Sequence, residues 1–286
     1  LLTYLVDIAL SKQHSNFFMS NSFKTFLKHT AKDFHNHSVN PPVVRASTII
    51  FKSMNDIRKT QNKYKKDPRG GYFDYGRQGT STTHILQKIL TKLEESYHVL
   101  LTPTGFGSVF LAIFSVVRPG DEIICSSHTF IATASSIVMA GGVPKPVDIG
   151  NDNLICTEAI SDAINSRTVG IMPTQLNGRI CNMDTIINLA NKHKLFVVED
   201  AAQALGARYK GKHSGTFGIA GAISFYPAKV MGCFGDGGAL VTNNYDIFNR
   251  SHQLHDQGRD VDGELKSWGR NSRLDNIQAC LLYTSD

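Results

Sequence analysis

The sequence predicts an α/β fold with a mainly parallel β-sheet flanked by helices. Short apolar segments recur between residues 97 and 242, and segments with the apolar spacing of a helix separate them. A half-exposed strand alternates apolar and polar residues, and these segments do not. A continuous apolar run is typical of strands buried on both faces. Sheets of this kind bind ligands at the carboxyl ends of their strands, so we expect the functional residues at that edge.

The individual elements follow from the apolar spacing and from the breakers between them. After the breaker at 40–42, residues 43–51 are expected to be extended, 56–66 to form a charged helix or loop, and 68–71 to form a turn. An amphipathic helix is predicted over 82–96. Further helices are predicted over 105–117, 131–140, 156–164 and 184–193. Strands are predicted over 97–102, 122–125, 168–172, 195–198, 220–225 and 239–242.

Composition excludes several classes of protein. The 286 residues are 41% hydrophobic, which is enough for a packed core and excludes overall disorder. No apolar run approaches the roughly 18 residues of a membrane span. Residues 1–10 are apolar but short, contain Asp7 and lack a basic start, so we expect no signal peptide. The absence of an initiator Met suggests a fragment.

The net charge of +6 is unevenly distributed. Residues 1–120 carry 16 basic and 7 acidic side chains (+9), whereas residues 121–286 carry 14 and 17 (−3). The basic residues are scattered and are not interleaved with regularly spaced aromatic residues, so we expect no nucleic-acid partner. The charge step near residue 120 suggests instead that the two parts differ in origin.

Cysteine and histidine usage points to neither disulfides nor metal. The five cysteines are odd in number, widely scattered and not at metal-ligand spacing, so a reducing cytoplasm is the expected compartment. His29, His35 and His37 lie close together and suggest a metal cluster at first sight. Because their segment is polar and lacks a ligand pattern, a solvated segment is the better interpretation, and no metal site is predicted.

Three segments at strand ends are candidates for chemistry. Residues 104–108 (TGFGS) join a strand to an apolar helix and suit a phosphate at the helix N-terminus, although Phe110 replaces the third glycine of a dinucleotide motif. An ordinary turn explains them equally well. Asp200 ends a buried strand. Taken alone, a carboxylate at this position can instead cap the next helix or bind a ribose. Lys229 follows the next predicted strand and taken alone would be a surface lysine; a tight turn at 235–238 follows it.

Together these segments match the needs of pyridoxal phosphate. That cofactor requires a phosphate cradle, a lysine that forms a Schiff base, and an anion beside the pyridine nitrogen. The anion keeps the nitrogen protonated, so that the ring can accept electrons from the substrate. The phosphate loop, the acid and the lysine occur in a suitable order along the chain.

From about residue 121 to residue 279, the chain resembles the sugar aminotransferases of the DegT/DnrJ/EryC1/StrS family, which have the fold of aspartate aminotransferase. The matching stretches are 127–133 (SHTFIAT), 173–179 (PTQLNGR), 198–207 (VEDAAQALGA), 224–229 (SFYPAK), 235–242 (GDGGALVT) and 269–279 (GRNSRLDNIQA). The resemblance implies that Lys229 is the Schiff-base lysine and that Asp200 is the partner of the pyridine nitrogen. It also implies cofactor contacts for four other residues: Gln203 at the ring oxygen, Phe130 on the ring face, Ser224 at the phosphate, and Asn271 at the phosphate of a neighbouring subunit.

Residues 40–120 resemble a different family, the Cys/Met-metabolism enzymes and above all cystathionine β-lyase. The matching stretches are 40–48 (NPPVVRAST), 75–80 (YGRQGT) and 100–108 (LLTPTGFGS). This resemblance implies that Tyr75 and Arg77 bind the partner subunit's phosphate. Thr104, Gly105 and Phe106 would form the phosphate loop of the same subunit.

Two resemblances that meet at the charge step suggest a chimera with a seam near residue 120. The expected organisation is an N-terminal arm (1–49), a cofactor-binding large domain (50–245) and the start of a C-terminal region (246–279), with most of the small C-terminal domain missing. Residues 280–286 (CLLYTSD) resemble a translated sequencing adapter and are expected to be an unrelated tail.

Three functions are therefore open. The first is amino transfer to a nucleotide-linked keto-sugar, in which Lys229 moves the proton between the substrate carbon and the cofactor. The second is a carbon–sulfur lyase that acts on a sulfur amino acid, cystathionine. The third is an inactive truncated hybrid. Both families imply a homodimer that acts on a small molecule, without nucleic acid or membrane.

Overall fold

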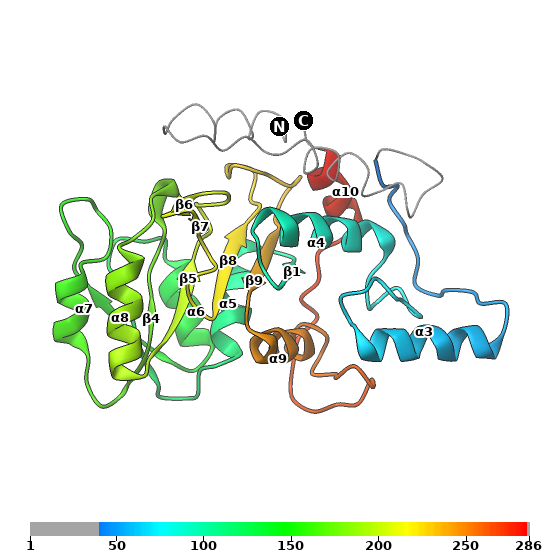
Figure 1. Ribbon diagram of the computed structural model, residues 1–286, viewed down its shortest axis with the longest axis horizontal. Helices are drawn as coiled ribbons and strands as arrows, with labels where there is room; N and C mark the ends of the chain where they lie inside the picture. Colours follow the sequence, from blue (N-terminus) through cyan, green and yellow to red (C-terminus); the bar gives the residue numbers. More distant parts are fainter. Residues whose placement is uncertain (1–39, 285–286) are drawn as a thin grey trace.

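A seven-stranded sheet forms the centre of the computed structural model, which describes residues 40–284 (Figure 1). The strand order is β1-β9-β8-β5-β4-β2-β3. All neighbours pair in parallel except β9, which runs antiparallel to both β1 and β8. The strands are β1 (His98–Thr102), β2 (Glu122–Ser126), β3 (Val143–Val147), β4 (Thr168–Met172), β5 (Phe196–Asp200), β8 (Ala220–Ser224) and β9 (Gly238–Thr242). The predicted mainly parallel α/β sheet is confirmed.

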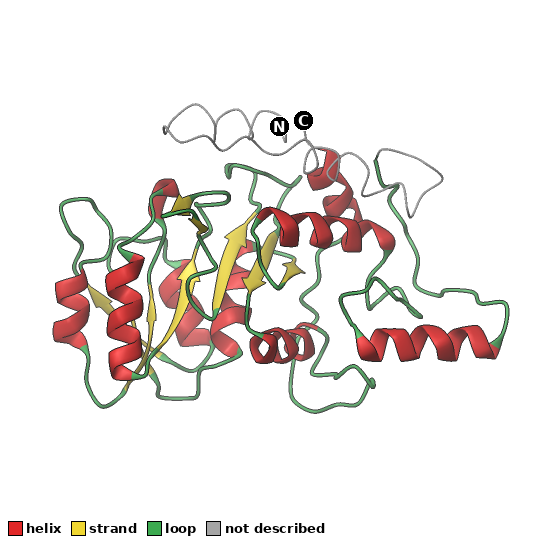
Figure 2. Cartoon of the chain, viewed as in Figure 1, coloured by secondary structure: helices red, strands yellow, loops and turns green. Residues whose placement is uncertain are grey.

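Helices cover both faces of this sheet (Figure 2). One face packs against α5 (Gly105–Phe114), α6 (Ala132–Met139) and α9 (Tyr245–His255). The other face packs against α4 (Ser81–Leu93) and α10 (Asn276–Thr284) over β1, β8 and β9, and against α8 (Met183–His193) and residues of α7 (Thr157–Ala163) over β4 and β5. Outside these layers lie α3 (Met54–Lys66), the short helix η1 (Leu176–Gly178) and a hairpin of β6 (Arg208–Tyr209) and β7 (Lys212–His213).

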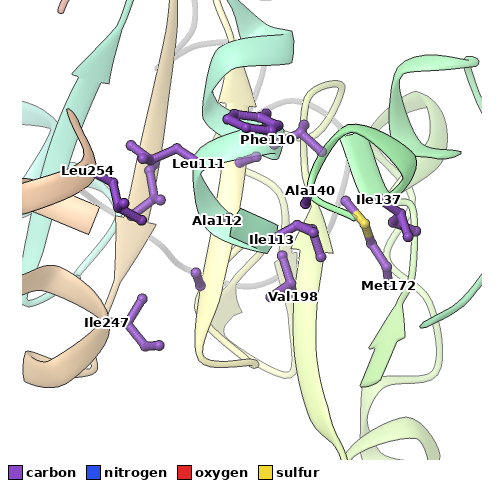
Figure 3. Close-up of a cluster of buried hydrophobic side chains, with 14 of the residues drawn as sticks. Phe110, Leu111, Ala112, Ile113, Ile137, Ala140, Met172, Val198, Ile247 and Leu254 are labelled. Carbon is purple, nitrogen blue, oxygen red and sulfur yellow. The ribbon is translucent and has the colours of Figure 1, made fainter. Parts of the chain in front are cut away.

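Burial on both faces explains why the strand sequences are apolar throughout. Along β1, Leu100 joins the core under α5, whereas Val99 and Leu101 join the core under α4 and α10. Helix α5 is almost entirely apolar because it lies across the middle of the sheet; Figure 3 shows its Phe110 and Ile113 within the cluster, which also contains Met172 and Val198. The edge of the sheet where functional residues are expected is therefore supported by a tightly packed core.

The sequence prediction missed several elements, among them β3 in the sheet and α9 in the layer that covers it. β3 contains Pro144 and Pro146 and was not predicted; it is an edge strand paired with β2 alone, where a missing N–H is tolerated. α9 begins at an Asn244 cap whose side chain accepts hydrogen bonds from two backbone N–H groups, and it buries Phe248 and Leu254. The predicted helix over 105–117 also ends earlier, at Phe114.

Residues on the two sides of position 120 are interleaved in one structure. β1 pairs along its whole length with β9, and α4 packs against α10. In α10, Leu282 is fully buried and Tyr283 is 8% exposed, so residues 280–284 continue a helix that covers the core. Helix α9, which begins at Tyr245 where a domain boundary was expected, packs Phe248 and Leu254 into the same core.

We expect acid to destabilise the fold through buried neutral histidines. Burial lowers the pKa of His84 to about 4 and that of His98 to about 3. Below the unfolded-state value of about 6.5, only the unfolded chain takes up these protons, so each histidine lowers the free energy of unfolding by up to about 1.4 kcal/mol per pH unit. The full free energy of unfolding is present above pH 6.5, and it is lost as the pH falls towards the pKa values of these histidines in the folded chain.

Urea unfolding between pH 5 and pH 7 measures this slope. His98→Gln should flatten the slope relative to the wild-type chain, because glutamine takes up no proton. If the two chains show the same slope, His98 does not contribute to the acid sensitivity.

Candidate active site

The carboxyl ends of the parallel strands bring the predicted residues to one edge of the sheet. Asp200 is the last residue of β5 and Ser224 the last of β8, while Thr104 follows β1 as the N-cap of α5. Phe130 lies between β2 and α6, and its carbonyl accepts a hydrogen bond from the Thr133 N–H. The parallel register of β5 and β8 makes Asp200 a neighbour of Ala222, two residues before Ser224.

Lys229 lies in the loop after β8 and lines a pocket of about 340 Å³. Gln203 and Ser224 line the same pocket, together with Asn177, Ala202, Leu205, Ala228 and Val230. A backbone hydrogen bond of 2.8 Å from the Lys229 N–H to the Tyr226 carbonyl forms the turn that carries the lysine. The structure thus places three predicted residues around one pocket: Lys229, Gln203 (predicted at the ring oxygen) and Ser224 (predicted at the phosphate).

Asp200 is a buried acid next to this pocket. Its side chain is fixed by two donors: the Thr133 hydroxyl to Oδ2 at 2.6 Å, and the Ala202 N–H to Oδ1 at 3.2 Å. Burial raises the pKa of Asp200, while these two hydrogen bonds and the charge of Lys229 act in the opposite direction. An acid held in this way is suited to a cationic partner, such as a protonated ring nitrogen.

The segment between β1 and α5 has the features of a phosphate cradle. A Cβ atom on Gly105 would collide with the Ser224 side chain, and one on Gly238 would collide with the Thr104 carbonyl, so both positions need glycine. The Thr104 hydroxyl accepts a hydrogen bond from the Gly107 N–H at 2.7 Å and caps the helix. Backbone N–H groups in the first turn of α5, including that of Phe106, have no partner within the helix and favour an anion.

Two further predicted contacts are accessible at this edge. Gln203 is oriented by a 2.9 Å hydrogen bond from the Asn177 N–H to its side-chain oxygen, which leaves the Gln203 amide group as a donor. Phe130 is 71% exposed, so its ring is available for stacking. Asn177 itself has a positive φ of 54° and was not among the predicted residues.

The structure does not bring the predicted partner-subunit residues to the Lys229 pocket. Arg77 forms an ion pair with Asp256 at 3.7 Å, and Arg273 contacts the same carboxylate at 2.7 Å. Arg77 lines a separate small cavity between α4 and α9. Tyr75 and Asn271 are both exposed, and the Asn271 backbone forms a bridge with Asp256.

Glu199, the neighbour of Asp200, is a second acid at the end of β5. It is fully buried and accepts four hydrogen bonds, from the N–H groups of Gly215, Phe217 and Gly218 and from Gln175 Nε2, at 2.6–3.0 Å. Burial raises the pKa of Glu199, and the four donors oppose that shift. This carboxylate fastens the loop before β8 to the end of β5, and it thereby sets the spacing between Asp200 and the Lys229 loop.

We expect Glu199→Gln to destabilise the fold by about 3 kcal/mol, because the amide places a donor against backbone donors in a buried site. For a chain of this size, the melting temperature should fall by roughly 5–10 °C. Glu264→Gln, at an exposed carboxylate, is the matched control and should change stability by less than about 0.5 kcal/mol. Equal melting temperatures for the two variants would contradict the role assigned to Glu199.

The donor set suits pyridoxal phosphate better than a metal. The site combines a lysine, a buried acid, a cradle that excludes a Cβ atom and an exposed aromatic ring. Within residues 40–284, no cluster of His, Cys, Asp and Glu could hold a metal ion. The histidines at 29, 35 and 37 lie outside the described residues.

The five cysteines form no disulfide, and no described helix is long and apolar enough to cross a membrane.

A family model for the DegT/DnrJ/EryC1/StrS aminotransferases matches residues 78–285. The chain belongs to this family. It is 39% identical over 190 residues to dTDP-3-amino-3,4,6-trideoxy-α-D-glucose transaminase from Streptomyces venezuelae, covering 66% of this chain and 50% of that protein. It is 35% identical over 227 residues to GDP-perosamine synthase from Caulobacter vibrioides, covering 74% and 60%. The chain therefore spans about half to three fifths of the length of these relatives.

Solved structures agree with the family assignment. The S. venezuelae DesV structure, in complex with a ketimine intermediate, has a TM-score of 0.68 at 33% identity and covers 80% of this chain and 60% of that one. The structure of 3-amino-5-hydroxybenzoic acid synthase has a TM-score of 0.69 at 26% identity, covering 84% and 63%. The fold is that of the pyridoxal phosphate-dependent aminotransferases.

The family match corrects the interpretation of the N-terminal part. It runs without interruption from residue 78 through residue 120, so the comparisons support neither a cystathionine β-lyase portion nor a chimera. The physical reason is visible in the sheet, where β1 pairs with β9 and α5 packs against both β8 and β9. The charge step at residue 120 is therefore a difference in surface composition within one fold.

Proposed function

We propose that the protein is a pyridoxal phosphate-dependent aminotransferase that transfers an amino group to a nucleotide-linked keto-sugar. The observation that carries this proposal is the position of Lys229, which shares a pocket with Gln203 and Ser224 while its charge acts on the buried Asp200. Membership of the aminotransferase family supports the same reaction class.

Each residue has a defined task in this proposal. Bound pyridoxal phosphate supplies an electron sink for the substrate carbon. Its phosphate would be bound at the N-terminus of α5 by Ser224, Thr104, Gly105 and Phe106, and Asp200 would keep the ring nitrogen protonated. Gln203 would donate to the ring oxygen, and Phe130 would stack on the ring. Lys229 would hold the cofactor and would accept and return the proton of the substrate carbon.

The names of the relatives support one substrate class. The names of similar proteins include transaminases or synthases of dTDP-, GDP- and UDP-linked sugars, and the common chemistry is amination of a sugar ketone. We infer a keto-sugar carried on a nucleoside diphosphate as the acceptor and glutamate as the donor. The expected location is the cytoplasm.

A homodimer is part of this proposal. Tyr75, Arg77 and Asn271 lie away from the pocket of their own chain, and Tyr75 and Asn271 are exposed. Side chains in such positions are available to a second copy. In the proposed dimer they would contact the phosphate bound by the partner.

Two half-reactions test the function. The chain is loaded with pyridoxal phosphate and mixed with glutamate, and 2-oxoglutarate is measured in a single turnover. One dTDP-, one GDP- and one UDP-linked keto-sugar are then added separately, and the amino-sugar is detected by mass spectrometry. We expect stoichiometric 2-oxoglutarate and one aminated sugar. Absence of 2-oxoglutarate from a chain that binds the cofactor would contradict the proposal.

A further inference from the structure

Three threonine hydroxyls form a hydrogen-bonded chain that ends on Asp200. Thr174, after β4, donates to the Thr129 hydroxyl at 2.9 Å; the Thr129 and Thr133 hydroxyls lie 2.7 Å apart; and Thr133 Oγ1 lies 2.6 Å from Asp200 Oδ2. Thr133 is fully buried and Thr174 is 4% exposed. The three residues come from segments that follow two different strands, and the chain of hydroxyls crosses between them.

The chemistry of the last contact sets the direction of the whole chain. An ionised carboxylate only accepts hydrogen bonds, so the Thr133 hydroxyl is the donor of the hydrogen bond to Asp200. Thr133 can then only accept from Thr129, and Thr129 in turn accepts from Thr174. Hydrogen bonds that point the same way polarise one another, which strengthens the final bond to the carboxylate.

This chain supplies one of the two fixed donors to Asp200. The other is the Ala202 N–H at the opposite carboxylate oxygen, so the two contacts together define the plane of the carboxylate. The backbone holds the same geometry, because the Asp200 N–H donates to the Pro173 carbonyl and the Gln175 N–H donates to the Asp200 carbonyl. Loss of the Thr133 hydroxyl would leave Oδ2 without this donor in a buried position.

We propose that Thr133 is a positioning residue, supported by Thr129 and Thr174, which keeps Asp200 ionised and aimed at the cofactor ring nitrogen. The inference rests on the proposed function, since it requires that ring nitrogen as the partner of Asp200. The three threonines lie within the family-like stretches 127–133 and 173–179, where the sequence assigned them no individual role. Thr133 acts through Asp200 and does not itself touch the ring.

The test compares Thr133→Val, which removes the hydroxyl at nearly constant volume, with Thr133→Ser, which keeps it. The dissociation constant of the cofactor is measured by absorbance titration for pyridoxal phosphate and for its deaza analogue, in which carbon replaces the ring nitrogen. We expect Thr133→Val to weaken binding of pyridoxal phosphate about tenfold, Thr133→Ser to restore it, and the deaza analogue to bind wild type and Thr133→Val equally.

Thr242→Val is the matched control, because Thr242 has a buried hydroxyl at the opposite end of β9 from the pocket. It should leave both dissociation constants unchanged, and unfolding curves should show that every variant is folded. Equal weakening of both ligands in Thr133→Val would indicate a merely structural role and overturn the inference. So would wild-type binding of pyridoxal phosphate by Thr133→Val. A wild-type chain that binds no cofactor would instead refute the proposed function, and the inference with it.

Discussion

Lys229→Ala should reduce the rate of the glutamate half-reaction by at least about 10³-fold. The variant loses both the covalent attachment of the cofactor and the group that moves the proton, and general acid–base catalysis alone contributes about 10²–10⁴-fold. Lys229 is half-buried at the end of a turn, so its truncation removes little packing and the chain should fold normally. Stopped-flow absorbance with glutamate measures the effect.

Two companion variants make this prediction specific. Lys229→Arg keeps the positive charge near Asp200 but cannot form the covalent link, and it should be as impaired as Lys229→Ala. Lys192→Ala removes an exposed lysine at the end of α8 and should react at the wild-type rate. A Lys229→Arg variant with more than a tenth of wild-type activity would show that another residue carries the chemistry.

Asp200→Asn should slow the same half-reaction by roughly 10²–10³-fold, the range found when one preorganised electrostatic contact is removed. Asparagine has nearly the same shape: its single oxygen can accept from the Ala202 N–H, and its amide group can donate to the Thr133 hydroxyl, whose hydrogen bonds then reverse direction. It lacks the charge that keeps the ring nitrogen protonated, so the electron sink is weakened.

The stability of the cofactor-free chain separates this effect from misfolding. Because burial disfavours the charged form of Asp200, the neutral asparagine should leave the melting temperature equal or higher. A half-reaction within threefold of wild type would mean that Asp200 does not face the ring nitrogen. A large drop in melting temperature would mean that its charge serves the fold.

The sequence predicted the parts of the fold that depend on local pattern. The apolar runs ending at Thr102 and Asp200 are strands because burial on both faces leaves a continuous apolar signature. β3 was missed because its prolines are acceptable only at an edge, and edge position is a property of the whole sheet. α9 did carry a local signal, the Asn244 cap with Asp246 in the first turn, which could have predicted it.

The site shows the same division between local and long-range information. The positions of Asp200 and Lys229 at strand ends were readable, because parallel strands place their carboxyl ends along one edge. The hydroxyl chain to Thr133 and the four donors around Glu199 were not, since each joins segments distant in the sequence. The charge step at residue 120 misled the domain interpretation because net charge reports on surface composition and carries no information about strand pairing.

The most direct test of the central claim is to locate the cofactor on the chain. The protein is incubated with pyridoxal phosphate and reduced with borohydride, which makes the covalent link permanent, and its peptides are then mapped by mass spectrometry. We predict that the added mass lies on the peptide containing Lys229 and that Lys229→Ala carries none. A label on a different lysine, or an unlabelled wild-type chain, would contradict the account.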